Sequence, residues 1–151
     1  MPKQRTIEKA RQDLRQGKSP STAAGEFVKE EIEHVREGKH GARSTKQAIA
    51  IGLSKARRAG VPLPAPKRGK TSQSTRRSAQ RDLATGQGKR KVPSRKRSRA
   101  ALRALKREPK QAASSAALSR HAKSVAARRR RTRSLAKRPA SKRAASTATA
   151  A

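Results

Sequence analysis

The amino-acid sequence predicts a mostly α-helical protein: a small N-terminal unit of two or three helices over residues 1–66, followed by a long basic tail over residues 67–151 that is largely disordered or conditionally helical. Hydrophobic residues recur at helical spacing in the first part. It also holds 11 of the 18 Ile, Leu, Val and Phe residues, the material for a core. The tail instead holds 28 of the 42 Lys and Arg residues, and the whole chain has only 9 Asp and Glu and a net charge of +33.

The first helix is expected to begin after Thr6, which is of a helix-capping type, and to end at Gly17. Its apolar stripe is Ile7, Ala10 and Leu14. A second helix is expected from Ser21 or Thr22 to Glu37, with Gly38 as its natural end. Its stripe consists of Ala24, Val28, Ile32 and Val35. Each stripe predicts one face that packs against a neighbouring helix.

A third helix has the clearest start and stop signals. Ser44 and Gln47 match the capping box, and Gly60-Val61-Pro62 ends the helix. The inward stripe is expected to be Ile49, Leu53 and Ala56. The second and third helices are therefore expected to pack as a hairpin.

Prolines at 62, 64 and 66 predict an extended spacer and a boundary near residue 66. Beyond it the apolar faces are thin, so we expect disorder in the free protein and helix formation where phosphates neutralise the charge. The segments with helical potential are residues 75–85, 98–107 and 112–137. Cysteine is absent, which excludes disulfides and thiolate chemistry.

The turn GKHG at residues 38–41, followed by ARSTK, predicts a phosphate-binding loop. Free amides at a helix start attract anions, and basic and hydroxyl side chains surround them here. The GxxG spacing is similar to the backbone clamp of KH domains, whereas the glycine spacing of a P-loop is not met. An ordinary turn with solvated charges is the alternative.

The basic tail predicts binding to nucleic acid through phosphates. With no Trp or Tyr and one Phe, the chain lacks aromatic platforms for bases, so binding should be sequence-tolerant. Anionic lipid and a nuclear import signal are alternatives for the same basic runs. The candidate nucleic-acid-binding residues are Lys39, His40, Arg43, Ser44, Thr45, Lys46, Lys55, Arg57, Arg58, Arg95, Lys96, Arg97, Arg128, Arg129, Arg130 and Arg131.

Other features indicate protein contacts rather than chemistry. Glu26, Glu30, Glu33 and Glu37 share one helix face, which is expected to hold the basic tail, dock a basic partner or remain solvated. Ile51 lies opposite the inward stripe, so the first helix or a second copy of the chain should cover it. The three histidines lack a paired ligand spacing, so no metal site or cofactor is expected. No catalytic arrangement is apparent, so no enzymatic activity is expected either.

Residues 30–64, and STKQAIAIGLSKARRAG above all, resemble a family of small basic bacterial proteins of unknown function, some labelled plasmid stabilisation proteins. The tail is similar in composition to the basic tails of linker histones. The resemblance implies a cytosolic bacterial protein, and no apolar run predicts a membrane segment. We expect a nucleoid-associated DNA-binding protein. The alternatives are an RNA- or ribosome-associated factor and an adaptor whose N-terminal helices bind a protein.

Overall fold

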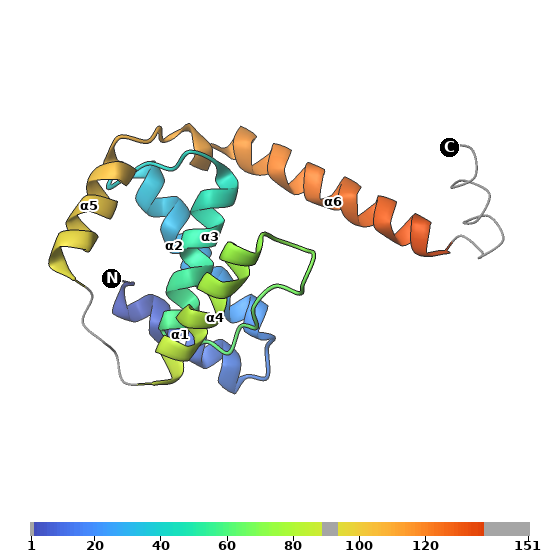
Figure 1. The fold of residues 1–151 in the computed structure, drawn as a ribbon, viewed down its shortest axis with the longest axis horizontal. Helices are drawn as coiled ribbons and strands as arrows, with labels where there is room; N and C mark the ends of the chain where they lie inside the picture. The colour runs from blue at the N-terminus through green and yellow to red at the C-terminus, as the bar shows by residue number, and fades with distance from the viewer. Residues whose placement is uncertain (1, 89–93, 138–151) are drawn as a thin grey trace. The chain divides into compact units, whose positions relative to one another are not determined.

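A computed structural model describes residues 2–88 and 94–137 of the chain. Over these ranges the protein is helical and has no strand, as the sequence predicts (Figure 1). The helices are α1 (Gln4–Arg15), α2 (Pro20–Arg36), α3 (Thr45–Arg58), α4 (Gln73–Gln87), α5 (Arg95–Lys106), a 3₁₀ turn (Gln111–Ala113) and α6 (Ser115–Lys137). Contacts divide the chain into two compact units, Met1–Ser114 and Ser115–Ala151.

The starts of α1 and α2 differ from the prediction, while their ends agree with it. Helix α1 begins at Gln4, before Thr6, and no side chain caps it. Helix α2 begins at Pro20, because Ser19 accepts the Thr22 amide at 3.2 Å and proline suits the first helical position. Both helices are followed by a glycine of positive φ, 72° at Gly17 and 76° at Gly38.

Helix α3 begins where the sequence predicts. The Ser44 Oγ accepts the Gln47 amide at 3.2 Å. The Gln47 side chain in turn accepts the Arg43 amide at 2.8 Å, one residue earlier than in the usual capping box. The first bond satisfies an amide that the first helical turn leaves without an intrahelical partner, and the second fixes the residue before the cap.

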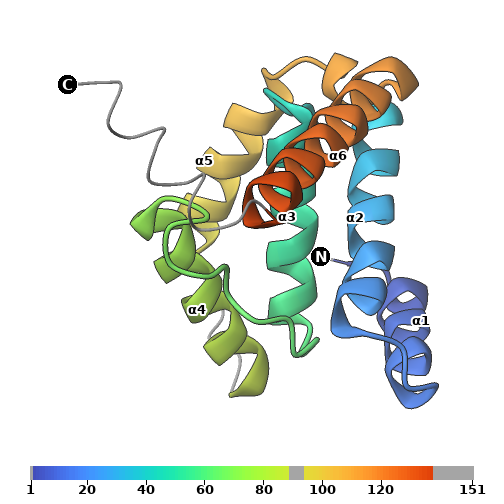
Figure 2. The ribbon, with the colours of Figure 1, turned by 90° about the vertical axis from the view of Figure 1, so that its right-hand side faces the viewer.

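The face of α3 that packs on α2 is made of small residues. Its buried members along the helix are Thr45, Ala48, Gly52 and Ala56, whereas Ile49 and Leu53 of the predicted stripe are only partly buried. Helices α2 and α3 lie side by side (Figure 2) and approach so closely that a Cβ built on Gly52 would lie 2.7 Å from the Val28 Cα. The predicted hairpin therefore exists, and its closest point is a glycine.

A small core joins α1, α2 and the end of α3. Phe27 is 1 % exposed at its centre and is surrounded by alanines and Val61. Ile7 and Leu14 of α1 pack against the same cluster, as their stripe predicts. Burying a side chain of this size contributes about 1.5–3 kcal/mol, so Phe27 is the main apolar anchor of the unit.

Helix α4 packs on α3 and thus belongs to the N-terminal unit. Asp82 accepts hydrogen bonds from the Ser54 hydroxyl at 2.6 Å and from the Arg58 guanidinium at 2.7 Å. Ile51 precedes Ser54 by three residues and Arg58 by seven, so it lies on the α4 side of α3. The expectation that the first helix covers Ile51 is wrong, since α1 packs on α2 and meets α3 only through the core on the opposite face, around Ala56.

The segment after α5 also returns to the first helices. The carbonyl of Ala112 accepts the Thr45 hydroxyl at 2.7 Å, and that of Ala113 accepts the Arg36 guanidinium at 2.9 Å. Ala112 and Ala113 are buried together with Val35 in a second core cluster. The division between units consequently falls at Ser114, rather than near residue 66.

The helical segments expected in the tail are present as α4, α5 and the 3₁₀ turn with α6. Helix α6 belongs to the second unit and has 23 residues, of which Leu135 is 49 % exposed. The predicted tail also includes residues 89–93 and 138–151, which lie outside the described residues. No helix in the described ranges is both long and apolar enough to cross a bilayer.

Candidate functional site

Four backbone amides of the predicted phosphate loop donate to protein carbonyls. Gly38 donates to Val35 at 3.2 Å and Lys39 donates to His34 at 3.0 Å. Gly41 donates to Leu105 at 2.8 Å, and the next amide, of Ala42, to Pro109 at 3.0 Å. The turn therefore binds the segment after α5, and these four amides already have hydrogen-bond partners.

The side chains of the same loop divide into exposed and buried groups. Lys39, Arg43 and Lys46 are exposed, as is Ser44. The Lys39 ammonium lies 2.6 Å from Glu37, and the Arg43 Nε lies 3.6 Å from Glu108. Thr45 is 8 % exposed and its hydroxyl is donated within the protein, so of the two predicted hydroxyls only that of Ser44 belongs to an exposed residue.

The candidate residues near the end of α3 have three different surroundings. Lys55 forms an ion pair with Glu31, whose side chain is fully buried. Arg57 is 6 % exposed and donates to the carbonyls of Leu63 and Pro64, where burial lowers the pKa of its guanidinium. Arg58 is exposed and holds Asp82. All three cations therefore have partners within the protein, and Arg58 is the most exposed of them.

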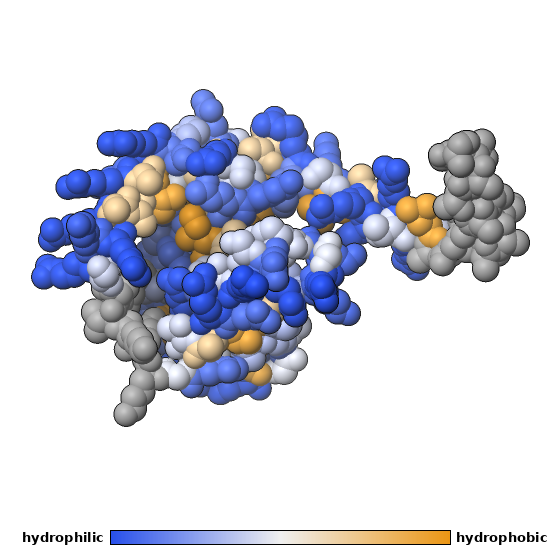
Figure 3. Space-filling model, in the orientation of Figure 1, coloured by the Kyte–Doolittle hydropathy of each residue, from blue (hydrophilic) through white to orange (hydrophobic). Residues whose placement is uncertain are grey.

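The tail candidates are all exposed. Arg95, Lys96 and Arg97 open α5, a helix with no buried residue. The run of four arginines at 128–131 lies in α6, in the other unit. Hydrophilic side chains cover much of the face seen in Figure 3. Each unit thus carries its own solvent-exposed basic helix.

The acidic face of α2 is largely used inside the unit. Glu26 lies 3.0 Å from Lys9 of α1. Glu30 is 4 % exposed, and one of its oxygens accepts the Lys3 amide at 2.9 Å. Glu37 pairs with Lys39, and that bond lowers the pKa of the Glu37 carboxyl. The stripe mainly binds α1 and its own helix end.

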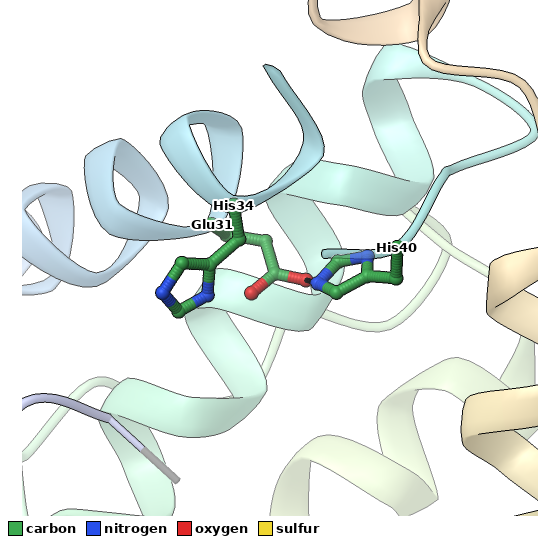
Figure 4. Close-up of side chains that lie close together, drawn as sticks. All are labelled: Glu31, His34 and His40. Carbon is green, nitrogen blue, oxygen red and sulfur yellow. Dashed lines mark ion pairs between the residues drawn. The ribbon is translucent and has the colours of Figure 1, made fainter. Parts of the chain in front are cut away.

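A cluster of Glu31, His34 and His40 lies beside this face (Figure 4). Each residue offers one donor atom, and the three atoms lie within 4.8 Å of one another. The rings of His34 and His40 are edge to face, with centroids 6.2 Å apart. Burial, and then the nearby Lys55, lower the pKa of the His34 imidazole, which favours its neutral form.

The sequence reasoning did not find this cluster because His40 is brought in by the turn after α2. One signal was nevertheless present: Glu31 and His34 are three residues apart, the spacing that places two ligands on one helix face. His40 lies in the turn outside this helix, so helical spacing could not place it beside the other two residues.

The comparisons with known proteins cover the same region. Residues 3–68 match the model of a family of unknown function, DUF6496. The match includes α1, α2 and α3 and ends before α4. No curated protein and no solved structure matches the chain. The DUF6496 region therefore holds the Glu31, His34 and His40 cluster and the predicted phosphate loop.

Proposed function

We propose that the protein binds nucleic acid, DNA in preference to RNA, through phosphate contacts and with little sequence preference. The observation that carries the proposal is α5. This helix has six Lys and Arg residues and no acid among its twelve residues, and it buries none of them. A helix that contributes no side chain to a core while displaying so many cations is suited to a polyanion.

The distribution of acidic groups supports this proposal. Seven of the nine acidic side chains lie within 4 Å of a basic side chain inside the first unit, and Glu8 and Glu33 are the exceptions. No ion pair in the described residues involves a side chain of α5 or α6. The basic excess is therefore concentrated on surfaces that lack internal counter-charges.

The position of Phe27 supports sequence tolerance. It is the only aromatic residue besides the histidines, and it is 1 % exposed within the core. Bases therefore have no Phe, Tyr or Trp on which to stack, and arginine and lysine contacts with phosphates carry little sequence information. The proposed location is the nucleoid of a bacterial cell. The resemblance to basic bacterial proteins, including those labelled plasmid stabilisation proteins, and the linker-histone-like composition agree with this role.

The salt dependence of DNA affinity tests the proposal. Each neutralised phosphate contributes about 0.9 to the slope of log K against log salt. Replacing Arg128–Arg131 by glutamine should therefore reduce the slope by up to about 3.6, whereas replacement by lysine should preserve it. The same comparison at Arg95 and Arg97 tests α5. An unchanged slope in both glutamine variants would reject phosphate binding by these helices.

The choice between nucleic acids is tested in cells. Crosslinking followed by sequencing of both DNA and RNA should recover DNA spread over many sites. Predominant recovery of one RNA class would support the ribosome-associated alternative and contradict the nucleoid role.

A further inference from the structure

The cluster of Glu31, His34 and His40 contains a buried carboxylate oxygen without a hydrogen bond. The Glu31 side chain is fully buried, and its Oε2 forms the ion pair with Lys55. The other oxygen, Oε1, accepts no hydrogen bond. An unsatisfied buried carboxylate oxygen is costly, because it loses its contact with water and gains nothing in exchange.

A ring nitrogen of His40 lies close to this oxygen without forming a hydrogen bond to it. The His40 Nε2 lies 3.2 Å from Glu31 Oε1, without hydrogen-bond geometry. The opposite nitrogen, Nδ1, lies 3.1 Å from the Gly41 carbonyl, which can only accept, so Nδ1 carries the proton. In the neutral ring, Nε2 then carries a free lone pair beside a carboxylate, and both groups can donate electrons to a metal ion.

We propose that Glu31, His34 and His40 bind a divalent transition metal, for which Zn²⁺ is the best fit. Two ligands at the usual 2.0–2.1 Å from a tetrahedral zinc lie about 3.3 Å apart. The Glu31 Oε1 and His40 Nε2 are separated by 3.2 Å. Two imidazoles and one carboxylate are a known zinc ligand set, and they leave a fourth position for water.

The charges around the cluster accommodate a cation. Glu30 and Glu31 are both buried, and each has one oxygen without a hydrogen bond. Lys55 supplies one positive charge to this pair of carboxylates. With neutral histidines the group retains a net negative charge, which a divalent ion would compensate. Glu30 Oε1 also lies 3.5 Å from His34 Nε2. In many metal sites a carboxylate beside the second nitrogen of a metal-binding histidine orients its ring in this way.

The ion would join α2 to the turn that follows it. His40 is next to Gly41, whose amide holds the carbonyl of Leu105. Metal binding at His40 would therefore stabilise the turn that binds the segment after α5. The proposed role is structural, and it is independent of the proposed nucleic-acid binding.

Titration of the tag-free full chain, stripped with EDTA, tests the site. Co²⁺ should give the intense visible absorption of a tetrahedral site at one equivalent, Zn²⁺ should displace it, and Zn²⁺ should raise the Tm. His40→Gln and His34→Gln should each weaken Co²⁺ binding by about tenfold or more, since each removes one of three ligands. His121→Gln is the matched control, because this third histidine lies in α6, in the other unit, and should leave the titration unchanged.

Two outcomes would overturn the proposal. The first is absence of a tetrahedral cobalt spectrum in the wild-type chain, which would show that the three residues do not bind a metal ion. The second is equal loss of binding in the His121→Gln control, which would indicate scattered surface binding. Circular dichroism identifies any variant that fails to fold. The titration of the wild-type chain does not depend on the variants and decides whether the metal ion binds.

Discussion

Replacing Gly52 by alanine should destabilise the first unit, although alanine is the better helix former. Gly52 lies in the middle of α3, where alanine would contribute about 1 kcal/mol of helix propensity. The added Cβ would lie 2.7 Å from the Val28 Cα and 3.0 Å from its nitrogen. These are backbone atoms, so no side-chain rotation can relieve the contact.

The size of the effect follows from that distance. Ordinary contact begins at 3.4 Å, so α2 and α3 must part by about 0.7 Å at their closest point. Overpacking of this kind costs about 1–3 kcal/mol, and the upper part of the range applies where backbone must move. After the gain in propensity, we expect a net loss of about 1–2 kcal/mol.

Gly25 provides the matched control. It lies on the exposed side of α2, and a Cβ built there meets nothing within 4 Å. Gly25→Ala should therefore stabilise the protein by about 0.5–1 kcal/mol, the usual difference between the two residues in a helix. In thermal unfolding followed by circular dichroism, the two variants should shift the Tm in opposite directions, by about 4 °C per kcal/mol. If Gly52→Ala is as stable as Gly25→Ala, the helices do not meet at Gly52 and the reasoning fails.

Three further substitutions test other contacts. Thr45→Val removes the hydroxyl that Ala112 accepts and should cost about 1–3 kcal/mol, whereas Thr45→Ser should keep most of the stability in a urea titration. Ser44→Ala removes the cap of α3 and should cost about 1 kcal/mol in the same titration, and a neutral result would mean that the cap contributes nothing. Ile51→Glu should release α4 from α3 at every protein concentration, seen as faster amide exchange in α4, while the protein still sediments as a monomer. Loss of self-association with unchanged amide exchange in α4 would instead show that Ile51 forms a dimer contact.

The sequence predicted features that depend on local chemistry. Ser44 caps α3, and Gly17, Gly38 and Gly60 have positive φ after helices. A hydroxyl at a helix start and a residue without Cβ at its end act through neighbouring atoms, so their effect can be recognised without the fold. The start of α2 was predicted too late, because Ser19 and Pro20 were assigned to the linker.

The sequence did not predict features that depend on backbone contacts between distant segments. Residues 105–113 are held through their carbonyls, which accept from the amides of Gly41 and Ala42 and from the side chains of Thr45 and Arg36. Every residue has a carbonyl, so no residue type in that segment indicates these contacts. The inner face of α3 was assigned to Ile49, Leu53 and Ala56; Ala56 is buried, but Gly52 was left out because hydrophobicity was given more weight than the close approach that a glycine permits. For the candidate site, the cations of α5 and α6 are exposed, whereas Thr45 is buried beside the Ala112 carbonyl and Arg57 beside the carbonyls of Leu63 and Pro64, and hydrophobic spacing gives no sign of either contact.

The bonds that hold the segment after α5 also determine an order of folding. The Arg36 side chain and the Ala113 carbonyl are 77 residues apart in the chain, and Thr45 and Ala112 are 67 apart. Closing loops of this length costs conformational entropy that a few hydrogen bonds repay only once α2 and α3 are already paired. During synthesis the first three helices leave the ribosome well before residue 112. They therefore associate first, and their hydrogen bonds with residues 105–113 form last. Amide exchange at Gly41 and Ala42 should accordingly be faster than in the middle of α3, since the last contacts to form are the first to open.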